Sequence, residues 1–396
     1  MLTYDQALAQ ILAQVTPLEP VQMLLFDSLG LVLAEDIVAP IDLPPFANSS
    51  MDGFAVRAED VQVVPAMLPI SGDIPAGVAS VPKLLPGTAL RIMTGAPLPP
   101  GADAVVPVEE TETQGQSVVI LTAAQQGQCI RPAGEDVKMG SIVVTTGSRL
   151  RPAEIGMCAA VGRMSVRTYP RPRVAIISTG DELVEPGQTL QSGQIYNSNA
   201  YSLAAQVSEA GGIVTHQLHA KDTPDALRAA FDLCVGADIL LTSGGVSVGD
   251  YDYVKAVLAE RGTVDFCRVA IRPGKPLAFG QWGKTLFFGL PGNPVSSMVT
   301  FELFVRPALR QMAGHTHPLR QTISARLTEE AAHHPGRQSY LRAVVTCDDN
   351  GYTVRPVAQQ GSGMLRSMVT ANALLIMPSK TAVISAGETA TVLLLD

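Results

Sequence analysis

Two kinds of hydrophobic periodicity divide the first half of the chain. Residues 3–15, "TYDQALAQILAQV", place apolar side chains at helical spacing, with Thr3 at the position of an N-cap. Between about 46 and 145 the pattern changes to short β-type runs such as "ALRIMTGAP" and "SVVILTAA", separated by proline and glycine. Helical spacing returns at 151–162, so the β-rich stretch is predicted to be an insertion between two pieces of one domain.

Strand and helix patterns alternate between residues 171 and about 316. The strand patterns are "RVAIISTG", "IVTHQLHA", "ADILLTSGG" and "TLFFGLPG". Helical patterns follow them, among them "DTPDALRAAFDLCV", capped by Asp222 or Thr223, and one long final helix over 293–314. Such alternation predicts parallel strands joined by crossovers, hence a doubly wound α/β sheet with both faces covered.

The tail, residues 319–396, alternates without helical periods, and "DDNGYTV" is a hairpin signal. It predicts a small β-barrel or sandwich. The expected chain is therefore multidomain, α/β plus β. Its expected domains are a discontinuous helical and extended domain over 1–45 and 146–170, a β-rich domain over 46–145, a central α/β domain over 171–318, and a C-terminal β domain over 319–396.

Composition narrows the class of protein. The formal net charge of -8 argues against a general nucleic-acid binder, which needs a basic face. No apolar run reaches the roughly 20 residues that span a bilayer, and the first ten residues lack the basic start of a secretory signal. We expect a soluble, cytoplasmic protein without nucleic-acid or membrane partners.

Cysteine and histidine offer little chemistry. The five cysteines are odd in number, far apart and form no C-x-x-C pair, which argues against a disulfide framework or a zinc ribbon. Cys234 and Cys267 lie in apolar stretches, where a small buried side chain is the expected role. His216 and His219 should point to opposite faces of a strand, so we expect structural or surface roles for them.

Three unusual loops follow strands of the α/β domain: "STGDEL", "TSGGVSVGDYD" and "GLPGNPVSS". Ligands of open parallel sheets bind beyond the carboxyl ends of the strands, where glycines expose N–H groups and helix N-termini favour anions. One glycine loop could be purely steric, but three on one edge predict a phosphate site. Its predicted members are Thr242, Ser243, Gly244 and Gly245, with Ser296 and Ser297 as further donors. The pattern is neither a Walker A motif nor a dinucleotide fingerprint, which disfavours an NTPase or a dehydrogenase.

Carboxylates crowd the same edge: Asp181, Glu182, Asp222, Asp250 and Asp252. Two like charges about 4 Å apart repel by roughly 4 kcal/mol at an effective dielectric near 20, more than the ~2 kcal/mol at most that a helix terminus returns. Phosphate and carboxylates together therefore predict a divalent cation, and oxygen ligands suit Mg²⁺. At least one of the five acids is expected to be a helix cap instead.

Basic side chains follow in "AIRPGKPLAFG". Arg272 and Lys275 flank a Pro-Gly turn that should hold them in place, and such a lysine is a point charge for an oxyanion. A solvated surface role is the alternative for Lys275. Metal, phosphate and a basic clamp are thus predicted to share one site.

Taken together and in order, these motifs resemble those of the MoeA family of molybdopterin molybdenumtransferases, to which the E domain of gephyrin is related. The resemblance covers nearly the whole chain. It rests on "NSSMDGFAV" (48–56), "RIMTGAPLPPGADAVVPVE" (91–109), "IRPAGEDVKMG" (130–140), "STGDELVEPG", "TSGGVSVGDYDYVK", "RPGKPLAFG", "GLPGNPVSS" and "GSGMLRSMVTANAL".

The resemblance implies a transferase that takes adenylated molybdopterin and molybdate, uses Mg²⁺, inserts molybdenum and releases AMP. It also implies an elongated homodimer, in which domain 1–45 with 146–170 mediates dimerisation and the α/β domain of one subunit faces the β-rich domain of the other. The C-terminal domain is expected to be a β-barrel. A pterin adenylyltransferase, and downstream molybdoenzymes or cofactor-maturation proteins, are candidate partners.

The motifs also carry over individual site residues. Those expected to act in catalysis or to bind substrate are Asp52, Thr94, Arg131, Glu135, Asp136, Glu182, Asp222, Asp252, Lys275, Pro291, Asn293, Pro294, Ser362 and Ser367. In the hypothesis, Glu182, Asp222 and Asp252 hold Mg²⁺, while Arg131 and Lys275 bind molybdate. Two positions depart from the family pattern: many relatives carry lysine at Arg272, and glutamate is frequent at Asp250.

Two other functions compete with this interpretation. A non-catalytic binding or scaffold protein could use the same fold, but every acid named above is present. A nucleotide pyrophosphatase of the related molybdopterin-binding fold is disfavoured by the two additional β-rich domains.

Overall fold

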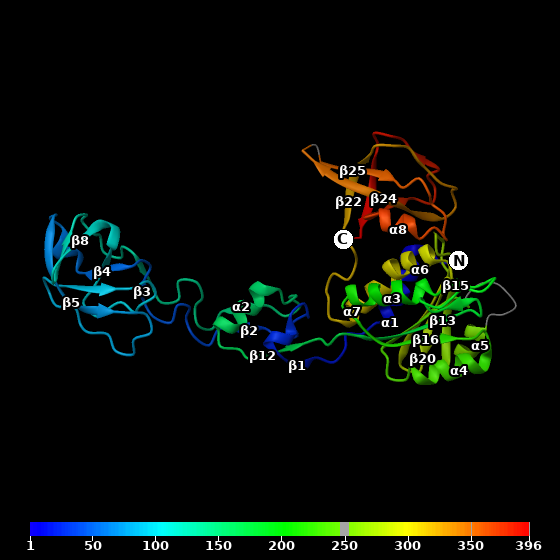
Figure 1. The fold of residues 1–396 in the computed structure, drawn as a ribbon, viewed down its shortest axis with the longest axis horizontal. Coiled ribbons are helices and arrows are strands. Elements are labelled where there is room, and N and C mark those ends of the chain that lie inside the picture. Colours follow the sequence, from blue (N-terminus) through cyan, green and yellow to red (C-terminus); the bar gives the residue numbers. More distant parts are fainter. Residues whose placement is uncertain (246–252, 350, 396) are drawn as a thin grey trace. The chain divides into compact units, whose positions relative to one another are not determined.

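The computed structural model describes residues 1–245, 253–349 and 351–395. The chain divides into two compact units. The first comprises residues 1–22, 30–34 and 167–396, and the second comprises residues 23–29 and 35–166 (Figure 1). Each unit is described by itself below.

A six-stranded sheet forms the centre of the first unit, in the order β16-β13-β17-β21-β20-β18. Its strands are β13 (Arg173–Thr179), β16 (Ile213–Ala220), β17 (Ile239–Ser243), β18 (Gly262–Arg268), β20 (Pro276–Trp282) and β21 (Thr285–Leu290). The strands β16, β13, β17 and β21 are parallel, as predicted, so the three loops that follow β13, β17 and β21 leave adjacent strands.

The prediction missed β18 and β20, which are antiparallel additions at one side of this sheet. Trp282 pairs with Thr285 across the two residues Gly283 and Lys284, and Gly283 has φ +62°. A two-residue turn with positive φ folds the chain straight back on itself, so no crossover helix separates β20 from β21.

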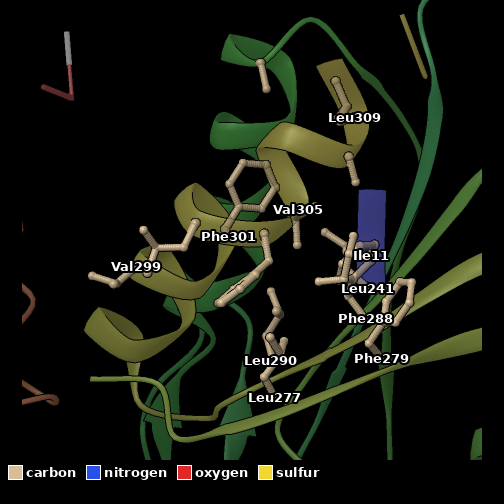
Figure 2. Packing of buried hydrophobic residues seen from close by; sticks show 14 of the residues in the cluster. Ile11, Leu241, Leu277, Phe279, Phe288, Leu290, Val299, Phe301, Val305 and Leu309 are labelled. Carbon is tan, nitrogen blue, oxygen red and sulfur yellow. The ribbon is translucent and has the colours of Figure 1, made fainter. Parts of the chain in front are cut away.

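Helices cover both faces of the sheet, because successive side chains of each strand point to opposite faces and both sets are apolar. Val174 and Ile176 join one core with helices α1 (Tyr4–Gln14), α3 (Ser198–Glu209) and α6 (Pro294–Thr300). Ala175 and Ile177 join a second core with α4 (Pro224–Leu233) and α5 (Tyr253–Arg261). Figure 2 shows the first core, where Phe288 of β21 lies beside Phe279 of β20, with ring centroids 5.1 Å apart, and Leu290 lies beside Leu277. The doubly wound arrangement is therefore confirmed.

The long final helix is interrupted, contrary to the prediction of one regular helix. A π-helical segment, η4 (Phe301–Val305), separates α6 from α7 (Arg306–Met312), and all its residues are buried. Helix α1 begins as predicted, since Thr3 Oγ1 accepts from Gln6 N and Gln6 caps in return. No described helix is both long enough and apolar enough to cross a membrane.

The C-terminal domain of the first unit is a closed five-stranded barrel, which decides between the two predicted architectures. Its strands run in the order β24-β25-β22-β28-β26, and β26 pairs back with β24. Asp348 lies opposite Gly351 in the predicted hairpin. The elements are β22 (Thr322–Leu327), β23 (Ala331–Ala332), β24 (Gln338–Asp348), β25 (Gly351–Pro356), α8 (Arg366–Thr370), β26 (Ala373–Met377), β27 (Val383–Ile384) and β28 (Thr389–Leu394).

The second unit is built on another six-stranded sheet, in the order β7-β4-β6-β5-β9-β8. Its strands are β4 (Gly53–Val56), β5 (Ala66–Ile74), β6 (Ala89–Ile92), β7 (Ala104–Pro107), β8 (Thr111–Gln114) and β9 (Ser117–Ile120). The unit also holds β2 (Ile37–Val38), β3 (Asn48–Ser49), β10 (Ile130–Arg131), β11 (Ile142–Val144) and α2 (Pro152–Ala160), while β1 (Val21–Leu24) and β12 (Ser165–Thr168) lie where the chain passes between the units. Every residue of β4 is buried, so the sheet carries a core on each face.

Candidate active site

An acidic pocket of about 410 Å³ lies at the carboxyl ends of the parallel strands. It joins the three predicted loops, because its lining includes Glu182, Asp222, Ser243, Gly244, Gly245 and Pro294. Two short strands, β14 (Leu183–Val184) and β15 (Ile195–Tyr196), form one side of it. The predicted meeting of acids and glycines at this edge is therefore present in the structure.

Asp222 is a site residue and not a helix cap. The cap of α4 is Thr223, whose Oγ1 accepts from Ala226 N at 3.3 Å, so the open alternative is settled in favour of Thr223. Burial raises the pKa of Asp222, and the negative charges of Asp181 and Glu182 raise it further. No positive charge among the described residues that line the pocket offsets this negative charge. Such a pocket suits a cation that prefers oxygen ligands.

The glycines at the end of β17 are required by packing as well as by the pocket. Gly244 has φ +94°, and a Cβ there would lie 2.9 Å from the carbonyl oxygen of Thr179. Gly245 has φ +66°, and its Cβ would lie 2.6 Å from Val254 Cγ2. Any side chain would be strained at both positions, so the backbone can approach a ligand closely here.

The predicted phosphate cradle needs correction. Thr242 is fully buried and is not part of the pocket lining, and Gly244 N already donates to Leu290 O at 3.1 Å. Ser296 lines the neighbouring basic pocket, and Ser297 is fully buried. Of the predicted cradle, Ser243, Gly244 and Gly245 line the acidic pocket.

Asn199 is a site residue that the sequence analysis missed. Its Nδ2 donates to Ser243 Oγ at 2.8 Å and to Gly292 O at 2.7 Å, so one side chain at the start of α3 links two of the loops. Its Oδ1 is buried and finds no partner among the described residues, which leaves an acceptor for a bound molecule. The only sequence signal was an asparagine pair at a predicted helix start, "NSNA", which is also typical of an ordinary cap.

A second, basic pocket of about 750 Å³ lies between the α/β domain and the barrel, both within the first unit. The α/β domain contributes Arg272, Lys275 and Ser296 to its lining, and the barrel contributes Arg342 and Ser362. Strand β19 (Ile271–Arg272) pairs in parallel with β24, with Arg272 opposite Ser339. The predicted basic clamp is therefore held by a strand that the α/β domain adds to the sheet of the barrel.

Arg342 is the most informative residue of the basic pocket, and the sequence analysis did not identify it. The residue is only 1% exposed, and its guanidinium donates to Ser367 Oγ at 3.2 Å and to Gly361 O at 3.3 Å. No carboxylate of the described residues forms an ion pair with it, and burial lowers its pKa to about 10. A buried cation without an acid is costly, so this pocket is built for an anion.

The two pockets meet at the loop of the barrel that contains the predicted Ser362. Gly361 and Ser362 line the basic pocket, and Gly363 lines the acidic one. Ser362 Oγ accepts from Asn293 Nδ2 at 3.2 Å, and its carbonyl oxygen accepts from Val295 N at 3.1 Å. The loop is thus fastened to the start of α6.

Several predicted residues do not line these two pockets. Pro291 is buried, and Ser367 acts on the basic pocket only through Arg342. Asp250 and Asp252 lie outside the described residues. Among those described, no group of three or more histidine, cysteine, aspartate or glutamate side chains has metal-binding geometry.

The second unit holds the remaining predicted residues. Asp52 accepts from Thr94 N at 2.7 Å and from Thr94 Oγ1 at 2.8 Å, and these bonds lower the pKa of Asp52. Arg131 is exposed at the end of β10, and Glu135 and Asp136 are exposed in the turn that follows. The carboxylate of Asp52 is thus held by Thr94 within its own unit.

Cys234, His216 and His219 have the expected structural roles. Cys158 and Cys234 are buried free thiols, and burial raises the pKa of Cys234 to about 11, far from that of a reactive thiolate. His219 forms a hydrogen bond with Gly180 O at 2.8 Å, and His216 with Thr215 Oγ1 at 3.2 Å. The side chain of Cys267 lies outside the described part of the chain.

Comparison with known proteins agrees with this geometry. Three family models match consecutive parts of the chain: the MoeA N-terminal region (domain I and II) at residues 2–162, a probable molybdopterin binding domain at 175–311, and the MoeA C-terminal region (domain IV) at 324–395. Molybdopterin molybdenumtransferase 2 of Mycobacterium tuberculosis is 44% identical over 93% of both chains. Molybdopterin molybdenumtransferase of Haemophilus influenzae is 37% identical over 99% of this chain and 98% of its own.

A solved structure of a similar protein covers the same length. The molybdopterin biosynthesis MoeA protein from Pyrococcus horikoshii OT3 has a TM-score of 0.83 and 30% sequence identity, and it covers all of both chains. The identity, the coverage and the three matched regions show that this chain belongs to the MoeA family.

Proposed function

We propose that this protein is a molybdopterin molybdenumtransferase, which inserts molybdate into adenylated molybdopterin with Mg²⁺-dependent release of AMP. One observation carries the proposal. An acidic pocket with a glycine loop and a basic pocket with an unpaired buried arginine share the loop that contains Ser362. A substrate that bears a pyrophosphate and a second substrate that is itself an oxyanion would fill two such neighbouring pockets.

The acidic pocket fits Mg²⁺ by its donor set. Glu182 and Asp222 offer carboxylate oxygens, the pKa of Asp222 is raised by burial and by like charges, and Asp252 is the proposed third ligand. A bound Mg²⁺ would supply Lewis-acid polarisation of the pyrophosphate. The chain itself orients the substrate, since Asn199 fixes the positions of Ser243 and the loop at Gly292.

The basic pocket is the proposed molybdate site. Arg272 and Lys275 present charges from the α/β domain, and Arg342 presents a buried charge from the barrel. Placing the oxyanion there brings it next to the pyrophosphate of the other substrate and offsets the buried charge of Arg342. Arg131 remains a proposed contributor from the second unit.

We also propose a homodimer, in which the β-rich domain of the partner completes the site with Asp52 and Arg131. Exposed apolar side chains in the expected dimerisation domain (1–45 and 146–170) support this proposal. Phe26 is 92% exposed, and Leu24, Leu29 and Met164 are more than half exposed. Leu25 N donates to Met164 O at 2.9 Å, which places the ends of this surface side by side. Isolated exposed apolar residues are common, but a group of four favours a covered interface.

The test is release of AMP from adenylated molybdopterin, measured with and without molybdate and with and without Mg²⁺. The proposal expects turnover only when both are present. Asp222→Asn should abolish it, and the matched Asp225→Asn, an exposed aspartate in the first turn of α4, should keep it. Molybdate-independent binding of molybdopterin without turnover would instead favour a scaffold protein, and hydrolysis of adenosine diphosphate ribose would favour a pyrophosphatase.

A further inference from the structure

A buried polar network joins three parts of the first unit. At its centre is Glu302, 5% exposed, in the π-helical segment η4. Its Oε1 accepts from Gln206 Nε2 of α3 at 2.8 Å, and its Oε2 accepts from Arg320 Nε at 2.9 Å. Arg320 belongs to the connection that enters the barrel at β22, so Glu302 fastens α3 and the barrel to the α6–η4–α7 helix.

Each fastened part carries residues of the site. Helix α3 begins with Asn199 in the acidic pocket, and α6 begins with Pro294 in the same pocket and Ser296 in the basic one. The barrel that follows Arg320 contributes Arg342 and Ser362 to the basic pocket. Rotation of any part about η4 would therefore change the shape of a pocket.

The apolar contacts between these parts do not fix their register by themselves. Tyr340 and Leu374 of the barrel belong to the same core as the helices, but hydrophobic burial is not directional. The hydrogen bonds of Glu302 are directional, and both carboxylate oxygens are used. A π-helical segment inside an α-helix is also a frequent mark of a functional position.

Electrostatics makes the network dependent on Glu302. Two arginines face it: Arg320, whose Nη2 also donates to Glu209 at 2.9 Å, and Arg306, whose Nε lies 3.8 Å from Glu302 Oε2. Burial, followed by the charges of Arg320 and Arg310, lowers the pKa of Arg306 to about 10. Without the negative charge of Glu302, the buried side chains of Arg306 and Arg320 would repel one another. The contact between the barrel and the α6–η4–α7 helix would then be weakened at this point.

We propose that Glu302, through Gln206 and Arg320, is a positioning residue that holds the acidic and basic pockets in register. The Arg320 arm sets the basic pocket and the Gln206 arm sets the acidic pocket. This inference rests on the proposed function, because it assigns molybdate to one pocket and adenylated molybdopterin to the other. Neither arm touches substrate, so their loss should alter binding of one substrate more than of the other.

The experiment compares KM and kcat for each substrate in full-length Arg320→Met and Gln206→Leu. Misplacement of a site by about 1 Å can cost on the order of 100-fold. We expect Arg320→Met to raise KM for molybdate by about ten-fold and to change KM for the pterin by less than about two-fold. Gln206→Leu should show the opposite split, and Glu302→Gln should raise both values.

Two controls separate positioning from general loss of structure. Arg228→Met removes an exposed arginine whose ion pair with Glu260 spans 2.8 Å, and it should leave both KM values unchanged. Arg320→Lys keeps the charge and should restore part of the molybdate KM. If Glu302→Gln does not fold, the two arm variants still decide the question.

The outcomes distinguish the two proposals. An inactive wild-type protein that still binds both ligands contradicts the proposed function, and equilibrium dialysis with molybdate then tests the Arg320 arm alone. An active wild type, with Arg320→Met and Gln206→Leu either unaffected or equally weakened for both substrates, overturns the positioning role.

Discussion

Replacing Arg342 by methionine should leave the stability of the ligand-free protein almost unchanged while it destroys the oxyanion site. The residue is 1% exposed, and burial lowers its pKa from 12.5 to about 10. At 1.36 kcal/mol per pKa unit, this shift corresponds to a penalty of about 3 kcal/mol on the charged form. Because a lowered pKa in a base penalises the protonated form, the whole penalty is present at neutral pH and disappears only as the pH rises past about 10.

Methionine removes that penalty and also the hydrogen bonds to Ser367 and Gly361. Hydrogen bonds from a charged donor are worth about 1.5–3 kcal/mol each, and these two, at 3.2 and 3.3 Å, belong at the low end. The penalty and the lost bonds therefore nearly cancel, and the free energy of unfolding should change by less than about 1 kcal/mol. Molybdate should recover most of the same penalty when it pairs with the arginine, so its affinity should fall by up to about 100-fold in the variant.

Urea unfolding followed by fluorescence measures both effects. The single tryptophan, Trp282, lies in β20 and belongs to the second core of the α/β domain, while Tyr340 of the barrel belongs to the first core, on the other face of the same sheet. At a molybdate concentration of about 100 times the wild-type Kd, the wild type should gain about 2.7 kcal/mol and the variant less than about 0.5. Arg355→Met, at an exposed position of β25, is the control and should behave like the wild type.

Two results would refute this reasoning. One is a variant that is destabilised by more than about 2 kcal/mol in the absence of any anion, because the arginine would then be a net stabiliser. The other is molybdate affinity within about two-fold of the wild type, because the buried charge would then face no anion.

Three further predictions follow from the sites. Asp222→Asn should raise the melting temperature of the metal-free protein at neutral pH but not below about pH 3.8, because a raised carboxyl pKa costs stability once the pH passes the ordinary value; calorimetry over this range checks it. Gly244→Ala should destabilise by about 1–3 kcal/mol, measured by urea unfolding, since Cβ would meet the backbone of Thr179 at positive φ. Phe26→Glu should convert a dimer to a monomer, read by light scattering, and a variant that stays dimeric would exclude this surface as the interface.

The elements of the first unit could be predicted where their formation depends on local pattern. The continuous apolar run of β13 buries both faces of a strand, and Thr3 with Gln6 caps α1 by contacts three residues apart. The antiparallel strands β18 and β20 were missed because the direction of β20 depends on the turn at Gly283. The α6–α7 helix was predicted to be regular because its apolar spacing is also compatible with a π-helical segment.

The candidate site, like the fold, could be predicted where it depends on the order of residues along the chain. Glycines, acids and basic residues that follow the ends of parallel strands must meet at one edge of the sheet, so Glu182, Asp222 and Gly244 could be placed together from their order alone. Which residue caps α4 could not be decided, since Asp222 and Thr223 are neighbours and both residue types are common N-caps. Only the folded loop assigns the bond to Thr223.

By itself the sequence determined which loops carry glycine, carboxylate and lysine. It also determined the alternation of strands and helices that brings those loops to one edge of the sheet. Only the tertiary structure decided that Arg342, far along the chain in the barrel, lines the same pocket as Lys275, and that Glu302 joins Gln206 to Arg320. The reason is physical. Local periodicity is fixed by backbone geometry, whereas the partner of a buried charge is fixed by the packing of distant segments, which no short stretch of sequence contains.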